Sequence, residues 1–261
     1  MSRRDAVSLT EILRWRGEQQ ADREAYGEWG DFDVAAWMTY GELDRKARAI
    51  GGALQRASAA GERALLLYPP GFEYIAAFFG CLYGNVIAVP AYPPEPARLD
   101  RTLPRLRAII ADARATIVLT TTDILALVGL VEQHAPELAA LHWIATDSLD
   151  DADAWKPLAT DRETVAFLQY TSGSTGLPKG VVVTHGNLLH NSVAIQKALG
   201  STPDTLKVSW VPPYHDMGLI GCIVQSLFVG FPLVSMSPVA FLLKPFRWLQ
   251  AISKRDRGSW D

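Results

Sequence analysis

The sequence has few cysteines and little net charge. In 261 residues there are two cysteines, Cys81 and Cys222, and each lies in an apolar stretch. This setting favours buried free thiols over a disulfide, which fits a protein of the reducing cytoplasm. The formal net charge is only −3. A chain so close to neutral gives no electrostatic sign of a nucleic-acid partner.

An uninterrupted hydrophobic run of membrane-spanning length is also missing. Two uncharged stretches, residues 74–94 and 217–243, come nearest, but glycines and prolines break both. We interpret each as a buried helix, a turn and a buried strand, so no transmembrane segment is expected. The N-terminus, Met1 to Asp5, is polar and lacks the apolar core of a signal peptide. These features predict a cytoplasmic protein.

Short apolar strands alternate with helices along most of the chain. Ser8 is a candidate N-cap for a first helix, and Thr39 with Glu42 forms a capping box before a second. Further helices are predicted at residues 72–83, 103–113, 123–134, 187–199 and 219–228, and strands at 64–68, 86–89, 116–120, 142–145, 207–211 and 233–236. Residues 147–160 are expected to form an exposed connector. Strands without polar alternation, separated by helices, predict an α/β fold with mainly parallel sheets flanked by helices.

The stretch Tyr170–Gly180, Tyr-Thr-Ser-Gly-Ser-Thr-Gly-Leu-Pro-Lys-Gly, lies between two predicted strands at 165–169 and 181–184. Glycine lets the backbone approach a ligand closely, and successive free N–H groups bind anions. Hydroxyls can donate to phosphate oxygens or, as at Thr175, help to hold Mg²⁺, and Lys179 adds a positive charge. The stretch therefore predicts a triphosphate-binding loop, whose candidate residues are Thr171, Ser172, Gly173, Ser174, Thr175, Gly176 and Lys179.

Its spacing separates this loop from two common nucleotide-binding motifs. A Walker loop requires Ser or Thr after the lysine, but Gly180 follows Lys179. A dinucleotide-binding loop requires G-x-G-x-x-G at the start of a helix, whereas a strand is predicted here. The alternative is an ordinary solvated hairpin loop. That alternative accounts for the glycines but not for the four hydroxyls and the Pro-Lys-Gly ending.

A second informative stretch, residues 209–218, reads Ser-Trp-Val-Pro-Pro-Tyr-His-Asp-Met-Gly. Pro212 and Pro213 end the predicted strand because proline cannot continue a ladder of hydrogen bonds. Ligand sites of α/β proteins lie at such strand ends. His215 on this turn is therefore a candidate site residue, although a lone histidine is more often structural.

Tyr170–Gly180 resembles, at every position, the signature loop of the acyl-adenylate-forming superfamily. This superfamily comprises acyl-CoA synthetases, luciferases, peptide-synthetase adenylation domains and fatty-acyl-AMP ligases. The string from Pro212 to Gly221, Pro-Pro-Tyr-His-Asp-Met-Gly-Leu-Ile-Gly, is most similar to fatty-acyl-AMP ligases. The resemblance implies ATP-dependent activation of a fatty acid to an acyl-adenylate, with release of pyrophosphate, feeding lipid or polyketide synthesis. A long-chain acyl-CoA synthetase is the alternative.

The resemblance also implies roles for individual residues. Lys179 and His215 would be catalytic, with His215 orienting the carboxylate, and ATP and Mg²⁺ would be the cofactors. A fatty acid is the implied substrate, and an acyl carrier protein or polyketide synthase module is a possible partner. The acyl chain would need an apolar tunnel, for which the candidate wall is Met217, Gly218, Ile220 and Gly221. The alternative for these residues is ordinary core packing, because apolar helix faces are usually core.

The resemblance runs along nearly the whole chain but covers only the front part of the family's pattern. It implies that residues 1–261 form an incomplete large N-terminal domain, with approximate subregions 1–160 and 161–261. The family's adenine-binding aromatic stretch, ribose-binding aspartate and small C-terminal lid domain have no counterpart here. A truncated, catalytically inactive fragment is therefore a further interpretation.

Overall fold

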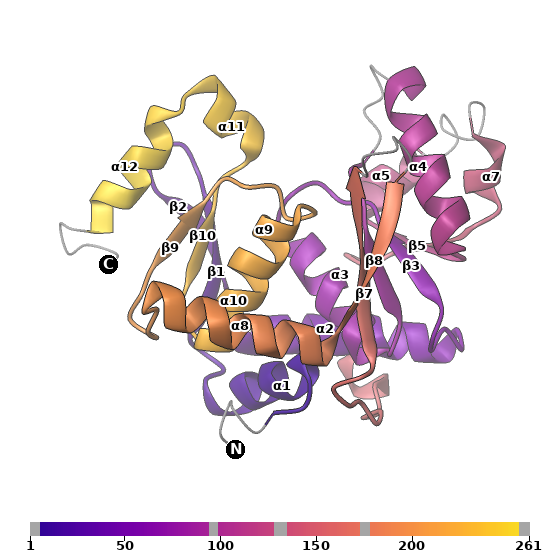
Figure 1. The fold of residues 1–261 in the computed structure, drawn as a ribbon, viewed down its shortest axis with the longest axis horizontal. Helices are drawn as coiled ribbons and strands as arrows, with labels where there is room; N and C mark the ends of the chain where they lie inside the picture. The colour runs from indigo at the N-terminus through magenta and orange to yellow at the C-terminus, as the bar shows by residue number, and fades with distance from the viewer. Residues whose placement is uncertain (1–5, 94–98, 128–134, 173–177, 256–261) are drawn as a thin grey trace. The chain divides into compact units, whose positions relative to one another are not determined.

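The computed structural model describes residues 6–93, 99–127, 135–172 and 178–255. The chain forms two compact units that interleave along the sequence (Figure 1). The first unit comprises Met1–Asp44, Pro70–Phe72 and Leu188–Asp261, and the second comprises Arg45–Pro69 and Glu73–Asn187. Neither unit is a continuous range, and the approximate subregions 1–160 and 161–261 stay a prediction.

The second unit is built on a six-stranded sheet with the strand order β6-β5-β3-β4-β7-β8. Every neighbouring pair is parallel except β7 and β8, which form an antiparallel hairpin at one edge. The inner strands β3, β4 and β5 are mainly apolar and buried, as is typical of a parallel sheet whose faces are covered by helices. The strands are β3 (Arg63–Leu66), β4 (Ile87–Pro90), β5 (Ile117–Thr120), β6 (His142–Ala145), β7 (Val165–Ser172) and β8 (Pro178–Thr184).

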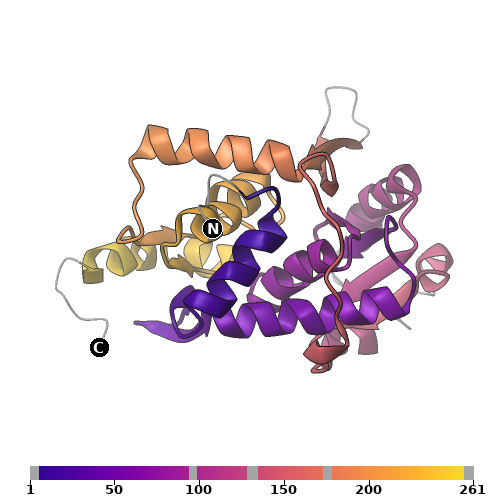
Figure 2. The same cartoon turned by 90° about the horizontal axis from the view of Figure 1, so that it is seen from below.

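Two long helices precede the middle strands of this sheet. Helix α2 (Tyr40–Arg56), seen along its length in Figure 2, begins at the predicted capping box. The amide of Thr39 donates to Glu42 Oε2 at 2.8 Å, and the amide of Glu42 donates to Thr39 Oγ1 at 3.2 Å. Helix α3 (Phe72–Tyr83) has the predicted bounds. A Cβ at Gly80 would lie 2.5 Å from Ile50 Cγ2, so the small residue lets α3 approach α2 closely.

Further helices of the second unit lie among the described residues. They are α4 (Leu99–Ala113), α5 (Thr122–Ala126), α7 (Pro136–Ala139) and the 3₁₀ helix η2 (Ala152–Ala154). The helix predicted at 123–134 corresponds to α5 as far as Ala126, whereas Leu127 is the C-cap and residues 128–134 lie outside the described residues. The stretch 147–160 is largely exposed, as predicted, but its Trp155 is buried. The ring of Trp155 packs on Tyr83 with centroids 5.0 Å apart, which anchors the connector.

The first unit contains a four-stranded sheet with the order β2-β1-β10-β9. Its strands are β1 (Glu24–Trp29), β2 (Val34–Thr39), β9 (Lys207–Ser209) and β10 (Leu233–Ser235). Strand β10 runs parallel to both β1 and β9, whereas β1 and β2 form an antiparallel hairpin. The sequence did not predict this hairpin, which brings the N-terminal part of the chain into a sheet with strands some 200 residues later.

The helices of the first unit follow the predicted order in outline. They are α1 (Leu9–Gln19), α8 (His185–Leu199, which the unit boundary crosses), α9 (Asp216–Gly218), the π-helix η3 (Leu219–Val224), α10 (Gln225–Val229), α11 (Pro238–Leu243) and α12 (Phe246–Arg255). Ser8 caps α1 as predicted, because its Oγ accepts from the amide of Glu11 at 3.2 Å. Helix α1 packs against α10.

The predicted α/β fold with mainly parallel sheets flanked by helices is therefore confirmed. Both cysteines are free and buried, as expected. Among the described residues, no helix combines the length and the apolar character needed to cross a membrane.

Candidate active site

The strands of the β7–β8 hairpin extend further into the Gly-rich motif than the sequence predicted. Thr171 pairs with Lys179, and Ser172 pairs with Pro178. Pro178 is the first residue of an edge strand, a position where its missing N–H costs no ladder hydrogen bond. The predicted phosphate-binding residues Gly173, Ser174, Thr175 and Gly176 lie outside the described residues, as does the side chain of Ser172.

Thr171 and Lys179 are brought together at the end of this hairpin. They are direct cross-strand partners, so their side chains project from the same face of the sheet. Both residues are exposed. A hydroxyl donor beside an ammonium group is suited to a phosphate oxygen, because charge-assisted hydrogen bonds are the stronger ones. The hairpin end thus offers two of the predicted phosphate ligands in adjacent positions.

The opposite end of the hairpin leads into α8 through a buried histidine. His185 is only 1% exposed, and its amide donates to the carbonyl of Thr164 at 3.1 Å. Burial lowers the pKa of His185 to about 4, against a smaller upward effect of the Asp161 carboxylate. The imidazole is therefore neutral at pH 7. The helix start is completed by Asn187, whose Oδ1 accepts from the amide of Thr184 at 3.0 Å.

The second predicted site residue, His215, is the N-cap of α9. Its amide donates to the carbonyl of Pro212 at 3.1 Å, which closes the turn that the two prolines begin. The side chain is 53% exposed. Its Nδ1 lies 3.2 Å from the amide of Met217 and 2.7 Å from Asp216 Oδ1. The amide of Met217 donates to His215 Nδ1 and also, at 2.7 Å, to Asp216 Oδ1, so both side chains cap the start of α9.

The helix after His215 contains a π-helical turn, a feature that occurs often at functional sites. Side chains from distant elements bind its backbone carbonyls. Lys207 Nζ donates to the carbonyl of Gly221 at 2.5 Å, and Tyr26 Oη donates to the carbonyl of Ile223 at 3.0 Å. The buried Arg16 caps the following α10, donating from Nε to the carbonyl of Leu227 at 2.6 Å. A second bond runs from Nη2 to the carbonyl of Phe228 at 3.1 Å.

Arg16, Tyr26 and Lys207 were not predicted as site-supporting residues. The one available sequence signal was an arginine on the otherwise apolar inner face of α1, since Leu9, Ile12 and Leu13 line that face. A fully buried arginine needs acceptors, and the carboxyl end of a helix provides them. Tyr26 and Lys207 gave no local signal, because their partners lie on the π-helix.

The two glycines predicted to leave room for an acyl chain differ in their surroundings. A Cβ at Gly218 would lie 2.1 Å from the carbonyl oxygen of Pro212, so the backbone of the turn can pass this close only because the residue has no side chain. A Cβ at Gly221 would meet only Met217 Cγ, at 3.8 Å, and otherwise faces open space. Met217 is 60% exposed and Ile220 is half-buried. Gly221 is thus the candidate wall position with room beside it, and the space a side chain at Gly218 would need is already filled.

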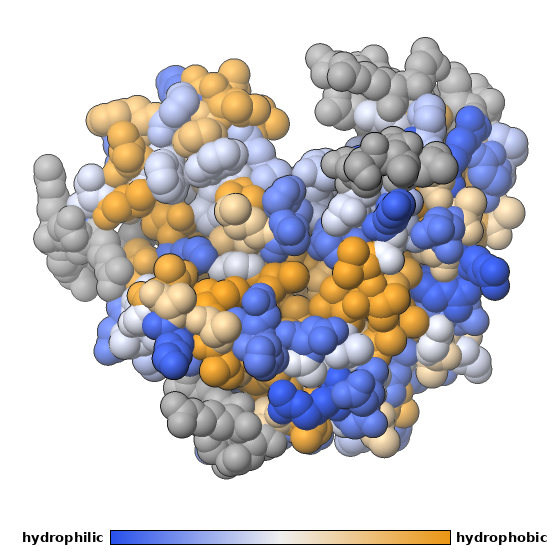
Figure 3. Space-filling view, viewed as in Figure 1, coloured by the Kyte–Doolittle hydropathy of each residue, from blue (hydrophilic) through white to orange (hydrophobic). Residues whose placement is uncertain are grey.

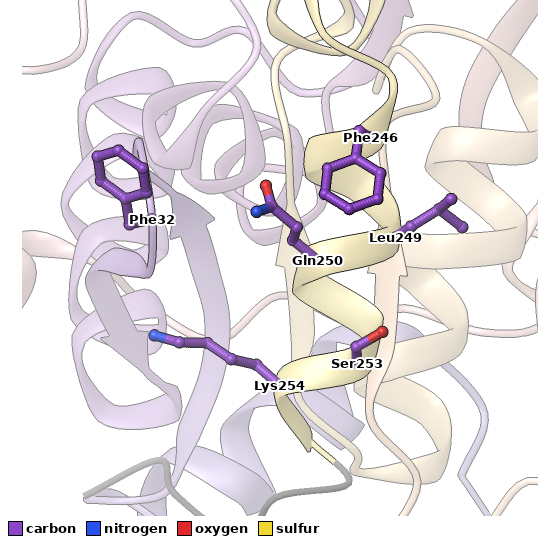
Figure 4. Close-up of a pocket in the computed structure, with 6 residues that line it drawn as sticks. All are labelled: Phe32, Phe246, Leu249, Gln250, Ser253 and Lys254. Carbon is purple, nitrogen blue, oxygen red and sulfur yellow. The ribbon is translucent and has the colours of Figure 1, made fainter.

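A pocket of about 370 Å³ lies in the first unit between the β1–β2 loop and α12 (Figure 4). Phe32 comes from the loop, and the other lining residues come from α12: Phe246, Leu249, Gln250, Ser253 and Lys254. Ion pairs flank Phe32 on both sides, joining Asp31 to Arg247 and Asp33 to Lys254. Figure 3 shows apolar surface over α11 and α12, where Leu242 and Leu243 are exposed. None of the predicted site residues lines this pocket.

The predicted residues fall into one set in each unit. Thr171 and Lys179 belong to the second unit, and His215, Met217, Gly218, Ile220 and Gly221 belong to the first. Within the described part of the chain, no group of three or more His, Cys, Asp or Glu side chains is arranged to hold a metal ion. Thr175, the predicted Mg²⁺ ligand, lies outside the described residues.

Comparisons of sequence and structure with known proteins indicate the same family as the two motifs do. The medium-chain-fatty-acid–[acyl-carrier-protein] ligase JamA of Moorena producens (strain JHB) is 45% identical over 259 residues, which is 97% of this chain and 44% of that protein. The long-chain-fatty-acid–AMP ligase FadD32 of Mycolicibacterium smegmatis is 35% identical over 95% of this chain and 40% of that protein. The chain therefore spans less than half the length of these relatives.

A solved structure gives the same result at the level of the fold. The fatty acyl-adenylate ligase from L. pneumophila, crystallised with acyl adenylate and pyrophosphate, superposes with a TM-score of 0.87 and 37% sequence identity. The match covers 97% of this chain and 43% of that protein. The family profile described as AMP-binding enzyme matches residues 13–256, which is most of the sequence. The chain belongs to the family of AMP-binding enzymes.

Proposed function

We propose that this chain supplies the phosphate-binding hairpin and the carboxylate-binding turn of an enzyme that activates a fatty acid as its acyl-adenylate. The observation that carries the proposal is the pairing of Thr171 with Lys179 at the exposed end of β7–β8, within the signature motif. The printed names of the relatives, a fatty-acid–acyl-carrier-protein ligase and a fatty-acid–AMP ligase, support the same chemistry.

The reaction joins two anions, so charge repulsion is its main obstacle. A carboxylate oxygen of the fatty acid attacks the α-phosphorus of ATP, forming the acyl–phosphate bond. The bond from the α-phosphorus to its bridging oxygen breaks, and pyrophosphate leaves with the electron pair. Lys179 would offset the negative charge on the phosphates, and Thr171 would donate a hydrogen bond. His215 would orient the carboxylate, since its half-exposed imidazole can donate to an anion.

ATP and Mg²⁺ are the proposed cofactors. The donor set fits a phosphate group, because an exposed ammonium and an exposed hydroxyl stand opposite each other at the hairpin end. Mg²⁺ would supply further positive charge on the phosphate oxygens. For Thr175, the role of metal ligand stays a prediction from the motif.

The acid is proposed to be a fatty acid whose chain passes Gly221. A Cβ there has room, and the neighbouring Met217 is a flexible apolar side chain. Gly221→Trp should therefore reduce activity on long-chain acids more than on short-chain acids. Gly221→Ala, which adds one methyl group in open space, is the matched control. An equal loss at all chain lengths would remove the tunnel from the proposal.

An acyl carrier protein or a polyketide synthase module is the proposed acceptor, and JamA is named as a ligase of that kind. Coenzyme A is the alternative acceptor, as in a long-chain acyl-CoA synthetase. Supplying the acyl-adenylate with each acceptor and measuring the thioester formed separates the two.

The buried free thiols of Cys81 and Cys222 fit a cytoplasmic location, where thiols stay reduced.

A fatty-acid-dependent ATP–pyrophosphate exchange assay tests the proposal. The assay is made on the protein that carries this sequence and on the 261-residue chain alone. Exchange that requires a fatty acid in the protein that carries this sequence supports the proposed activity, and its absence there overturns it. Exchange by the 261-residue chain would contradict the interpretation of this chain as an inactive fragment.

A further inference from the structure

Gly180, the last glycine of the signature motif, has a structural role that phosphate binding does not explain. Gly180 is the cross-strand partner of Tyr170 in the β7–β8 hairpin. A Cβ at Gly180 would lie 2.9 Å from Tyr170 Cζ and 3.0 Å from its hydroxyl oxygen. The phenol ring therefore crosses the strand directly over Gly180. Aromatic rings that cover a glycine on an edge strand are a known way to stabilise such edges.

The hydroxyl of Tyr170 reaches a carboxylate on a neighbouring helix. It donates to Asp112 Oδ2 at 2.6 Å, a length typical of a bond to an ionised acceptor. Asp112 lies in the last turn of α4, and α4 packs on β8. The ring itself is 6% exposed and belongs to the buried cluster that includes Val89, Leu103 and Leu106. The bond thus joins α4, β7 and β8 through one side chain.

This bond lies directly beside the two exposed phosphate-binding candidates. Tyr170 precedes Thr171, and Gly180 follows Lys179. Side chains alternate between the faces of a strand, so Thr171 and Lys179 project from the face opposite to Tyr170. In the described part of the chain, β8 is the edge strand of its sheet and pairs only with β7. The hydrogen bond from Tyr170 to Asp112 therefore joins this sheet edge to α4 on the face opposite to Thr171 and Lys179.

We propose that Tyr170, Asp112 and Gly180 form a positioning device that fixes the hairpin end, and with it Thr171 and Lys179, for the phosphates of ATP. Tyr170 and Asp112 are positioning residues and do not touch the substrate. Gly180 is required because only a residue without a side chain lets the ring pass. The proposal rests on the function proposed above and assigns a structural reason to three residues of that site.

Four substitutions test the device in the protein that carries this chain. Tyr170→Phe keeps the ring and removes the donor, and Asp112→Ala removes the acceptor. Gly180→Ala leaves both groups in place but displaces the ring. Asp112→Asn is the matched control, because its side-chain oxygen still accepts a hydrogen bond.

The first readout is the exchange assay with ATP and fatty acid varied separately. The first three variants should raise the KM for ATP by about 3- to 10-fold and leave the KM for the fatty acid unchanged. Asp112→Asn should stay close to the unmodified protein. Tyr170→Phe combined with Asp112→Ala should be no worse than either alone, because both remove the same bond. Additive losses, or equal rises in both KM values, would contradict the device.

The second readout does not depend on activity. Hydrogen exchange at the amides of Thr171 and Lys179 should accelerate in the first three variants, with no change at β3 or β5. Unchanged exchange at the hairpin end overturns the positioning device. If the unmodified protein shows no fatty-acid-dependent pyrophosphate exchange, the proposed function fails and the link to ATP fails with it. Hydrogen exchange then still decides whether the bond fixes the hairpin.

Discussion

The end of the β7–β8 hairpin and the helical stretch after His215 present their candidate residues by different means. From Phe167 to Ser172 the hairpin is a regular antiparallel ladder, and cross-strand pairing sets Thr171 opposite Lys179. The stretch from Asp216 to Val229 is irregular, passing from an α-turn through a π-turn to a second α-helix. Its geometry depends on Arg16, Tyr26 and Lys207, which come from three other elements.

This difference has a consequence for how each region responds to substitution. A site residue on a regular strand end is exposed and contributes little to stability, so its replacement should affect ligand binding alone. A helix whose backbone is bound by buried side chains of other elements is part of the core. Substitutions in such a helix, or of the side chains that bind it, should therefore lower the free energy of unfolding. The effects on the free energy of unfolding can therefore separate the two regions.

The largest expected effect is the loss of the guanidinium that caps α10. Arg16→Met would leave the buried carbonyls of Leu227 and Phe228 without these donors, so we expect about 3–5 kcal/mol lower free energy of unfolding. Arg14→Met on the same helix is the control, since the Arg14 side chain is 40% exposed and pairs with the exposed Glu18. Urea unfolding measures both. Comparable small changes in the two variants would show that the helical stretch does not depend on α1.

The next effect concerns pH and the base of the hairpin. The pKa of His185 is about 4 in the folded protein and near 6.5 in an unfolded chain. The unfolded state therefore binds more protons between these values, and stability must fall as pH is lowered from about 6.5 to 4. The full loss is about 3 kcal/mol. Above pH 6.5 this contribution is constant.

The control for this pH dependence is His185→Gln, which cannot titrate. The free energy of unfolding, measured by urea titration at intervals from pH 4 to 7, should fall less steeply in the variant. Parallel curves for the two proteins would mean that burial does not keep His185 neutral. Asp161, whose pKa is lowered by its hydrogen bonds to Thr164, is present in both proteins, so its own titration does not distinguish their curves.

A smaller effect distinguishes the two glycines after His215. Gly218→Ala places a methyl group against the carbonyl of Pro212, and we expect about 2–3 kcal/mol of destabilisation. Gly221→Ala faces open space and replaces a poor helix former, so it should be neutral or stabilise by up to about 1 kcal/mol. Thermal or urea unfolding of the pair gives the comparison directly. Similar losses at both positions would contradict the difference in packing.

The smallest expected effect on stability is at Lys179. Its side chain is exposed at the hairpin end, so Lys179→Met should change the free energy of unfolding by less than about 0.5 kcal/mol. Lys156→Met, at another exposed position of the second unit, is the matched control. A loss of several kcal/mol in the Lys179 variant alone would show that the hairpin end is part of the core.

Local sequence signals predicted most elements whose stabilising contacts are local. The capping box at Thr39 and the cap at Ser8 placed two helix starts, and the apolar run at Phe72–Tyr83 gave both ends of α3. The motif Tyr170–Gly180 was predicted as a loop, yet its first three residues and its last three belong to strands. Cross-strand pairing of exposed hydroxyl and lysine residues leaves no hydrophobic pattern to detect.

Elements that depend on distant partners could not be predicted in the same way. Strand β1 contains Gly27 and Glu28, and its place in the sheet comes from parallel pairing with β10. The π-turn at Leu219–Val224 was predicted as an ordinary helix, because the donors that bind its carbonyls are Tyr26 and Lys207. The role of Gly180 beneath Tyr170 was missed for the same reason: the ring's acceptor, Asp112, lies on α4.

The central claim is that the hairpin end binds the phosphates of ATP. Titration of ATP into the protein that carries this chain, its Lys179→Met variant and its Lys156→Met variant tests this claim most directly. We predict that Lys179→Met weakens ATP binding by about tenfold or more, whereas Lys156→Met binds ATP as the unmodified protein does. Equal affinity in all three proteins, or no binding of ATP by the unmodified protein, would contradict it.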